Sequence, residues 1–267
     1  MINKVLSSES VEFNQCTTEY PNADAKVHHC HERYELLYVV RGNCRLCIEG
    51  NELILSPGSL LLLKPFQYHS VEIDDSDKYE RFVIHFAAEA IIREIRMRFE
   101  LLLDTMEGHI GIYYAPNRLP GTIKRVLFHF NDASHVAKEE RDLFFRLLIS
   151  ELICLMSVSM RKVIVQNDRE LGAKLARYIN DHIDWDISLD AIAKHFFMSK
   201  YYMCHVFKEY SGVSIHAYIT QKRLALARQM MALGNTAAVS AYKVGFGDYS
   251  AFYRAYVKAY GKPPTSV

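Results

Sequence analysis

The feature that most constrains this chain is a pattern of helix signals that occurs twice between residues 187 and 261. In the first copy Ser199 can accept the first backbone amides of a helix, and Gly212 stands where a helix commonly ends. Asp248 and Gly261 stand 49 residues further on (248 − 199 and 261 − 212) in the same two roles. Each copy reads as two short helices joined by a tight turn, so the repeat predicts two helix-turn-helix units.

The same shift of 49 residues places Phe197 on Phe246, both in the turn between the two helices of a unit. Residues 214–233, between the copies, read as one amphipathic helix about 27 Å long at 1.5 Å per residue. Such a helix could set two recognition helices into successive major grooves, which lie about 34 Å apart. Ala237 and Ser240 occupy core positions of the second unit, so we expect its first helix to be anchored less firmly.

Charge is distributed unevenly along the sequence. The whole chain has a net charge of only +1, whereas residues 191–267 hold ten Lys and Arg against two Asp and Glu, a net charge of +8. A basic region that coincides with two helix-turn-helix units is the electrostatic pattern expected of a nucleic-acid-binding domain.

The apolar face of the second helix in each unit leaves a set of polar and aromatic side chains facing outward. These side chains are Lys200, Tyr201, Cys204, His205, Lys208, Tyr249, Ser250, Tyr253 and Arg254. Arginine suits the O6 and N7 atoms of guanine, whereas tyrosine and serine suit phosphates or thymine methyl groups. Together with the positive charge, this pattern predicts that both helices bind double-stranded DNA.

The run VGFGDYSAFYR, from Val244 to Arg254, and the closing YGKPP resemble the DNA-binding domain of the AraC/XylS family of bacterial transcription regulators. The resemblance covers about the last hundred residues, with Ala237 and Ser240 departing from the larger aliphatic residues usual at those positions. It implies a small-molecule effector, a homodimer, and RNA polymerase as a further partner. It places six side chains at base-facing or phosphate-facing positions: Tyr201, Cys204, His205, Tyr249, Ser250 and Arg254.

Residues 27–86 have the texture of a β-rich domain. Short apolar or alternating runs are separated by turn signals such as Gly42-Asn43, Gly50-Asn51 and Pro57-Gly58. Regular short strands of this kind predict a sandwich or a small barrel. Residues 1–26 give no clear signal.

The spacing His29-x-His31-x3-Glu35, with His69 further on, resembles the two motifs of the cupin family, whose fold is a small jelly-roll barrel. In metal-binding cupins the matching residues are ligands, and three imidazoles with a carboxylate suit iron, manganese or zinc. Phe66, however, stands where that family usually has glycine. We therefore favour a metal-free pocket for a small polar effector, lined by His29, His31, Glu35 and His69, and expect no bound cofactor.

Two further histidines, His28 and His85, are interpreted as rim or core residues without a role in binding. Cys44 and Cys47 have the C-x-x-C spacing of a zinc site, but no second pair accompanies them. Positions i and i+3 of a strand also point to opposite faces, so we expect no metal at these cysteines. With neither a signal peptide nor a run of 18 apolar residues in the sequence, we expect a soluble, cytoplasmic protein without a membrane partner.

The middle of the chain changes to helical patterns. Residues 87–104 are amphipathic, and residues 110–121 are broken by Gly and Pro and are expected to form a loop. A helix within residues 138–160 carries a leucine stripe that is too apolar for a lone surface helix. The stripe consists of Leu143, Leu147, Leu148, Leu152 and Leu155. It either packs on the β-rich domain or forms a dimer seam, and the family resemblance favours the dimer.

These patterns predict an α+β multidomain protein. Residues 1–88 form a cupin-like β-barrel, residues 89–162 a helical connector and dimerisation segment, and residues 163–267 an all-α tandem helix-turn-helix domain that begins with a linker at 163–168. The matching function is a sequence-specific DNA-binding transcription regulator controlled by a small molecule, and not an enzyme. The alternative is a metal-dependent cupin enzyme with a helical appendage, for which the His and Glu set is the only support. Whether it activates or represses stays open.

Overall fold

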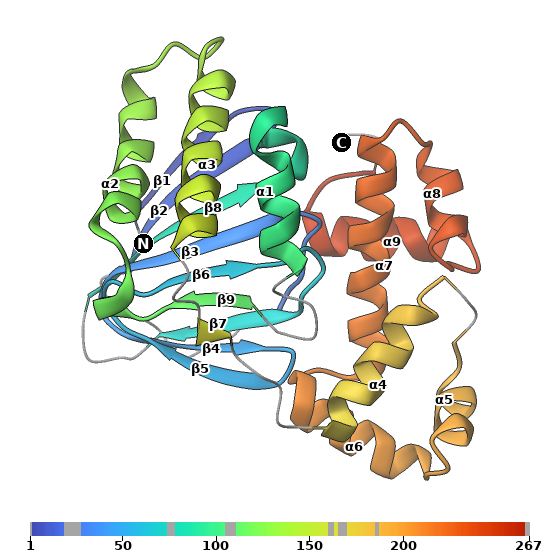
Figure 1. The fold of residues 1–267 in the computed structure, drawn as a ribbon. Helices are drawn as coiled ribbons and strands as arrows, with labels where there is room; N and C mark the ends of the chain where they lie inside the picture. The colour runs from blue at the N-terminus through green and yellow to red at the C-terminus, as the bar shows by residue number, and fades with distance from the viewer. Residues whose placement is uncertain are drawn as a thin grey trace.

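In the computed structural model, an N-terminal part that contains the strands and helices of its own lies beside an all-helical C-terminal part (Figure 1). The structure describes residues 2–18, 28–73, 78–104, 111–159, 163–164, 170–184 and 187–264. The predicted class, a β-rich N-terminal domain followed by an all-α tandem helix-turn-helix, is confirmed. None of the helices in these ranges is long and apolar enough to cross a membrane.

The strands form two sheets in which every pairing is antiparallel. The larger sheet has the order β1 (Ile2–Ser7), β2 (Val11–Thr18), β8 (Tyr79–Phe86), β3 (Tyr34–Arg41), β6 (Leu60–Leu63), β9 (Gly111–Tyr114) and β10 (Val163–Ile164). The smaller sheet has the order β5 (Asn51–Leu55), β4 (Cys44–Ile48) and β7 (His69–Ile73).

Four of the described strands lie where the sequence did not indicate them. β1 and β2 occupy a stretch that gave no clear signal, and β9 lies inside the expected loop of residues 110–121. β9 has only four residues, too few to show a period, but β6 offers it a partner strand, with Leu60 opposite Tyr114. β10 occupies the first two residues of the expected linker, of which residues 165–168 lie outside the described chain.

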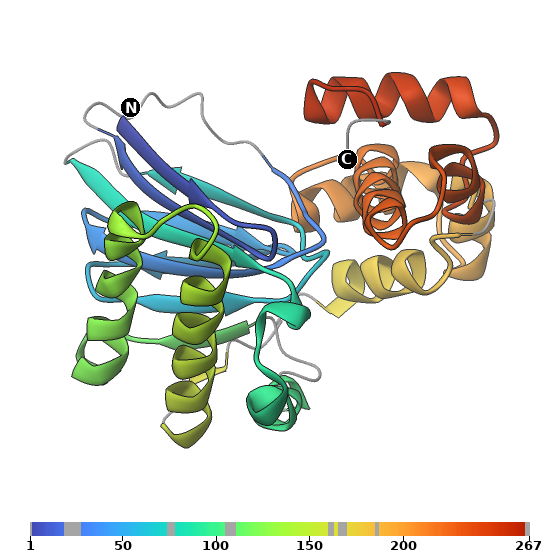
Figure 2. The same ribbon diagram turned by 90° about the horizontal axis from the view of Figure 1, so that it is seen from above.

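Alternation along the larger sheet gives it two apolar faces. Leu36 and Tyr38 of β3 pack with the helices of the middle segment, whereas Leu37 and Val39 pack with the smaller sheet. Figure 2 shows the helices along one face of the sheet, and Figure 1 labels them as α1 (Arg93–Asp104), α2 (Gly121–His129) and α3 (Arg141–Val158). A 3-10 turn precedes each of them: η1 (Ala88–Ala90) before α1, η2 (Pro116–Arg118) before α2 and η3 (Phe130–His135) before α3.

The leucine stripe of α3 divides between two surfaces instead of forming one seam. Leu148 and Leu152 are buried in the core between α3 and the sheet. Leu143 and Leu147 are 59% and 51% exposed, on the opposite side of the helix. Cys44 is buried and Cys47 half-buried in the alternating pattern of β4, which confirms the prediction that they point to opposite faces.

The C-terminal part contains α4 (Glu170–Asp181), α5 (Leu189–His195), α6 (Lys200–Ser211), α7 (Ile215–Ala232), α8 (Ala237–Lys243) and α9 (Tyr249–Tyr260). The predicted caps are confirmed. The Ser199 hydroxyl accepts from the Tyr202 amide at 3.2 Å, and an Asp248 carboxylate oxygen accepts from the Ala251 amide at 2.8 Å. Gly212 and Gly261 end α6 and α9 in the left-handed conformation.

From the first helix to the turn, equivalent residues of the two units are 48 positions apart, not 49. Ser188 caps α5 as Thr236 caps α8 (236 − 188 = 48), and Phe197 and Gly245 share the left-handed conformation at the turn, with φ of 53° and 88°. Phe197 therefore corresponds to Gly245, and the predicted match to Phe246 is wrong. The turn of the second unit holds one extra residue, which restores the 49-residue spacing at the next cap.

The buried hydroxyls of Ser240 and Ser211 generate a matched prediction. Ser240 is completely buried in α8, and its hydroxyl has no hydrogen-bond partner among the described residues. The hydroxyl of Ser211, also buried, donates to the Phe207 carbonyl at 2.8 Å. Because an unpaired buried hydroxyl is unfavourable and a paired one is favourable, Ser240→Ala should raise the free energy of unfolding by about 1 kcal/mol and Ser211→Ala should lower it by about as much. Urea unfolding of both variants checks this, and equal losses of stability would contradict it.

Candidate functional site

The outward face of α6 holds the side chains predicted to meet DNA in the first unit. Lys200, Tyr201, His205 and Lys208 are exposed, and Cys204 is half-buried. Two of them have acidic neighbours. Lys200 Nζ lies 3.0 Å from a carboxylate oxygen of Asp190, and His205 Nε2 lies 3.4 Å from one of Glu209. These exposed contacts are weak, so both side chains remain available to a phosphate.

On α9, the second helix of the other unit, Ser250, Tyr253 and Arg254 are exposed. Tyr249 is half-buried, because its ring packs 5.8 Å from that of Phe252, centroid to centroid. The two outward faces belong to helices that are joined through α7, which packs against both units. The orientation of the nine residues agrees with the predicted DNA face, whereas their contacts with DNA stay a prediction.

The four residues of the predicted effector site come together in the structure. One ligand atom from each of His29, His31, Glu35 and His69 lies within 4.8 Å of those of the others. Glu35 is on β3, on the face that looks toward the smaller sheet, and His69 begins β7. His29 is held against His69 by an antiparallel bridge, in which each backbone amide donates to the other residue's carbonyl at 2.9 Å.

Backbone carbonyls orient two of these imidazoles. His31 Nδ1 donates to the Arg33 carbonyl, and His69 Nδ1 donates to the Gln67 carbonyl, each at 2.9 Å. Both Nε2 atoms therefore point to the cluster, 2.8 Å and 3.2 Å from the same oxygen of Glu35. Glu35 and His69 are almost completely buried.

Electrostatics in the cluster favour an ionised carboxylate. Burial alone would raise the pKa of Glu35, but the charge of His69 and a hydrogen bond from His31 hold that pKa well below its usual value. His85 joins the cluster, with its Nε2 3.3 Å from the same Glu35 oxygen. Burial opposes the protonation of His85, but hydrogen bonds with Glu12 and Glu35 outweigh it and raise the pKa to about 9.

The interpretation of His85 as a rim or core residue stays a prediction, but the structure places its side chain beside Glu35. His85 stands directly opposite Glu35 in the register of β3 with β8. The alternation of β8 already placed it on the same face as Val83, so only the register was missing from the sequence. His28 lies outside the cluster, stacked on the ring of Tyr68 at a centroid distance of 5.9 Å.

A second polar site joins the β-rich part to α7, and it begins at the turn between β4 and β5. Glu49 and Gly50 form this two-residue turn, with φ of 44° and 76°. Positive φ at both residues is typical of a type I′ turn, where glutamate is uncommon because of its side chain. Gly50 is required as well, since a Cβ there would lie 1.9 Å from the carbonyl oxygen of Tyr210 on α6.

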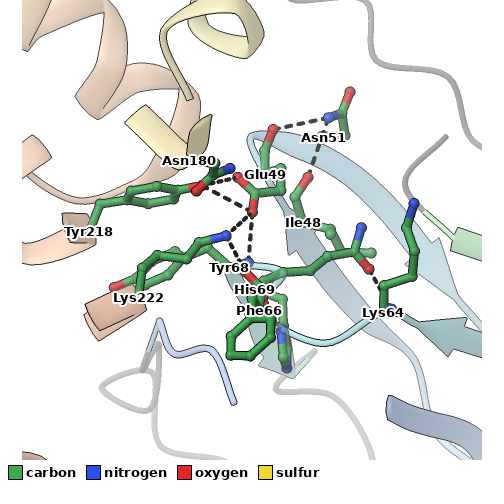
Figure 3. A network of polar contacts seen from close by, with 11 residues as sticks. Ile48, Glu49, Asn51, Lys64, Phe66, Tyr68, His69, Asn180, Tyr218 and Lys222 are labelled. Atoms are coloured by element: carbon green, nitrogen blue, oxygen red, sulfur yellow. Dashed lines mark hydrogen bonds and ion pairs between the residues drawn. The ribbon is translucent and has the colours of Figure 1, made fainter. Parts of the chain in front are cut away.

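The strained turn presents the Glu49 carboxylate to α7 (Figure 3). One oxygen accepts from Lys222 Nζ at 3.2 Å, and the other accepts from the Tyr218 hydroxyl at 3.0 Å. Lys222 also donates to the carbonyl of Phe66, and it is only 5% exposed. Phe66, at the position usually taken by glycine in the cupin motif, has a φ of 63°, in the left-handed region that favours glycine. We call these four residues, Glu49, Phe66, Tyr218 and Lys222, the interdomain contact.

The residues next to the cluster extend the interdomain contact. The ring centroids of Tyr68 and Tyr218 lie 5.3 Å apart. Cys30 is buried with these two residues in the apolar core of the helical part. His69 and His29 thus belong to the cluster, while their neighbours Tyr68 and Cys30 pack against the helical part. Sequence reasoning missed this contact, and its only signal was a lysine, Lys222, on the apolar side of the predicted helix.

Comparisons with known proteins agree with both halves of this description. A family model described as an AraC-like ligand binding domain matches residues 16–106, and one described as a helix-turn-helix domain matches residues 192–267. The uncharacterized HTH-type transcriptional regulator YbfI of Bacillus subtilis (strain 168) is 21% identical over 250 residues, which cover 92% of this chain and 86% of that protein.

The HTH-type transcriptional activator RhaS of Enterobacter sp. (strain 638) is 23% identical over 256 residues, 92% of this chain and 88% of RhaS. Among solved structures, ToxT from Vibrio cholerae shares 13% identity, with 96% of this chain and 97% of ToxT covered, at a TM-score of 0.43. The sequence matches to regulators favour the regulator over the cupin enzyme. The chain belongs to the AraC family of transcriptional regulators, with an AraC-like ligand-binding domain followed by a helix-turn-helix DNA-binding domain.

Proposed function

We propose that this regulator binds duplex DNA through the outward faces of α6 and α9, under the control of a small molecule bound by His29, His31, Glu35 and His69. The observation that carries the proposal is the pair of capped units whose exposed faces coincide with the +8 charge of residues 191–267. The same proposal divides the chain at residues 88 and 162. Because RhaS is named an activator, we include RNA polymerase among the partners.

The interdomain contact provides a route from the ligand to the DNA-binding helices. α7 carries both units, and its Lys222 and Tyr218 are held by Glu49 and Phe66 of the β-rich part. A ligand that moves His69 also moves Tyr68, whose amide donates to the Glu49 carboxylate at 2.9 Å. Ligand binding and the docking of α7 are therefore coupled through a single short segment, as control between two sites requires.

Arg254 tests how the second unit takes part in DNA binding. It is exposed on α9, and arginine can bind guanine through two hydrogen bonds. On duplexes selected from a random pool, Arg254→Ala should cost about 1–3 kcal/mol and relax preference at one base pair if the side chain reads a base. If it binds phosphate, all sequences should weaken alike, and the slope of log K against log salt should lose about one unit.

The matched control for this measurement is Arg118→Ala, because Arg118 is an exposed arginine of the β-rich part. Its affinity and salt dependence should equal those of the wild type. If Arg254→Ala behaves like this control, α9 does not bind DNA in the proposed way.

The exposed side of α3 is the surface that we propose for dimerisation, with a second copy of this chain as its occupant. Leu143, Leu147 and Val158 are each more than half exposed, and their spacing of 4 and 11 residues keeps them on one side of the helix. A two-fold axis beside α3 would pair this apolar strip with itself, as isologous contacts require.

Leu147→Asp tests the dimer, because a charge at the proposed seam would face its own copy. In sedimentation, the variant should be monomeric at concentrations where the wild type is dimeric. Its fold should be intact, with the melting temperature of the wild-type monomer. Ile54→Asp, on the exposed side of β5, is the control and should leave the dimer intact. Leu148 is unsuitable for this purpose, because it is buried against the sheet. A wild-type chain that is monomeric with and without DNA would rule the proposal out.

A further inference from the structure

We propose that His29, His31, Glu35 and His69 bind a divalent transition-metal ion, and that this ion is the signal to which the regulator responds. The inference rests on the proposed function, and it names the ligand of the same site. It reverses the preference for a metal-free pocket, because the structure supplies three observations that spacing alone did not contain.

The first observation is the distance between the donor atoms. Around a tetrahedral ion with bonds of about 2.0–2.2 Å, donor atoms lie roughly 3.4 Å apart. The Nε2 atoms of His31 and His69 lie 2.8 Å and 3.2 Å from the Glu35 oxygen, and all four donors fall within 4.8 Å of one another. Small movements would open this group around one ion.

The second observation is the orientation of the imidazoles. The Arg33 and Gln67 carbonyls accept the Nδ1 protons of His31 and His69. The Nε2 atom of each ring, which can bind an ion, therefore points toward the carboxylate. Among the described residues, His69 Nε2 is buried without a hydrogen-bond partner, although it lies 3.2 Å from the Glu35 oxygen. Carbonyl groups that fix the outer nitrogen of a histidine are typical of metal sites, in which the inner nitrogen binds the ion.

The third observation is the surrounding packing. The space between the two sheets is filled by buried apolar side chains, among them Leu37, Leu46, Leu61 and Leu63. The cluster is thus a polar group at the edge of an apolar core, and an ion there would replace imidazole protons that otherwise offset the charge of Glu35. Three nitrogen donors with one carboxylate suit zinc, iron or manganese better than calcium or magnesium.

The position of the ligands connects the ion to DNA binding. His29 and His69 face each other across one antiparallel bridge, and an ion between them would fix that bridge. Their neighbours Cys30 and Tyr68 are buried against α4, α6 and α7. Metal binding should therefore change how firmly α7 is held and, with it, the affinity for DNA.

The test uses the full chain, stripped with a chelator and then titrated with Zn²⁺ or Co²⁺. We expect one ion per chain by metal analysis, a higher melting temperature, and visible Co²⁺ absorption bands. Glu35→Gln and His69→Ala should each weaken Zn²⁺ binding at least tenfold, and His31→Ala, at the half-exposed rim, repeats the test if the buried variants fail to fold. His129→Ala removes an exposed histidine far from the cluster in sequence, and it should bind Zn²⁺ like the wild type.

DNA affinity is then measured with and without saturating Zn²⁺, and a change of about five- to a hundredfold is expected. A wild type that binds no ion, or variants that bind it as tightly as the wild type, would overturn the metal site. Specific binding without any change in DNA affinity would overturn its role as the signal. If the protein binds no DNA in either state while the variants still lose Zn²⁺, the proposed function fails and the metal site stands.

Discussion

The structure depends on one constraint, which is that neighbouring residues of an extended strand point to opposite sides. At the bridge between His29 and His69, this constraint makes the two sides of the same backbone face different parts of the protein. One side carries imidazoles toward the buried carboxylate of Glu35, and the other carries Cys30 and Tyr68 into the core of the helical part. In the proposed mechanism, a change at the cluster is therefore transmitted to the helical part.

The interdomain contact combines favourable and unfavourable contributions to the free energy of docking, which suits it to the proposed switch. Removing Lys222 and Glu49 from water is costly, and their attraction repays that cost only with help from further hydrogen bonds. Tyr218 and the Tyr68 amide supply such bonds to Glu49, and Phe66 supplies one to Lys222. The left-handed backbone at Glu49 and Phe66 adds strain, which weakens the contact. A modest ligand-binding energy is enough to shift such a balance.

Local signals in the sequence predicted the helical half well. The features that were missed depend on pairing between residues that are far apart in the sequence. Caps such as Ser199 and Asp248 act within three residues, so they were readable before any fold was known. The cluster of four was predictable from motif spacing, but His85 joins it only through the register of β8 with β3. Glu49 and Lys222 are separated by 173 residues, and neither carries a pattern that points to the other. For the same reason β9 was missed, because its place in the sheet depends on pairing with β6 and β10, which are distant in the sequence.

Amide hydrogen exchange on the full-length protein, stripped of metal and then saturated with Zn²⁺, tests most directly whether the cluster and α7 act together. We expect protection to change at residues 28–31 and 66–69 and, in the same titration, along α7 and the Glu49 turn. Glu35→Gln should remove both changes together. Protection that changes around the cluster while α7 stays as it was would contradict the coupling on which this account of the regulator depends.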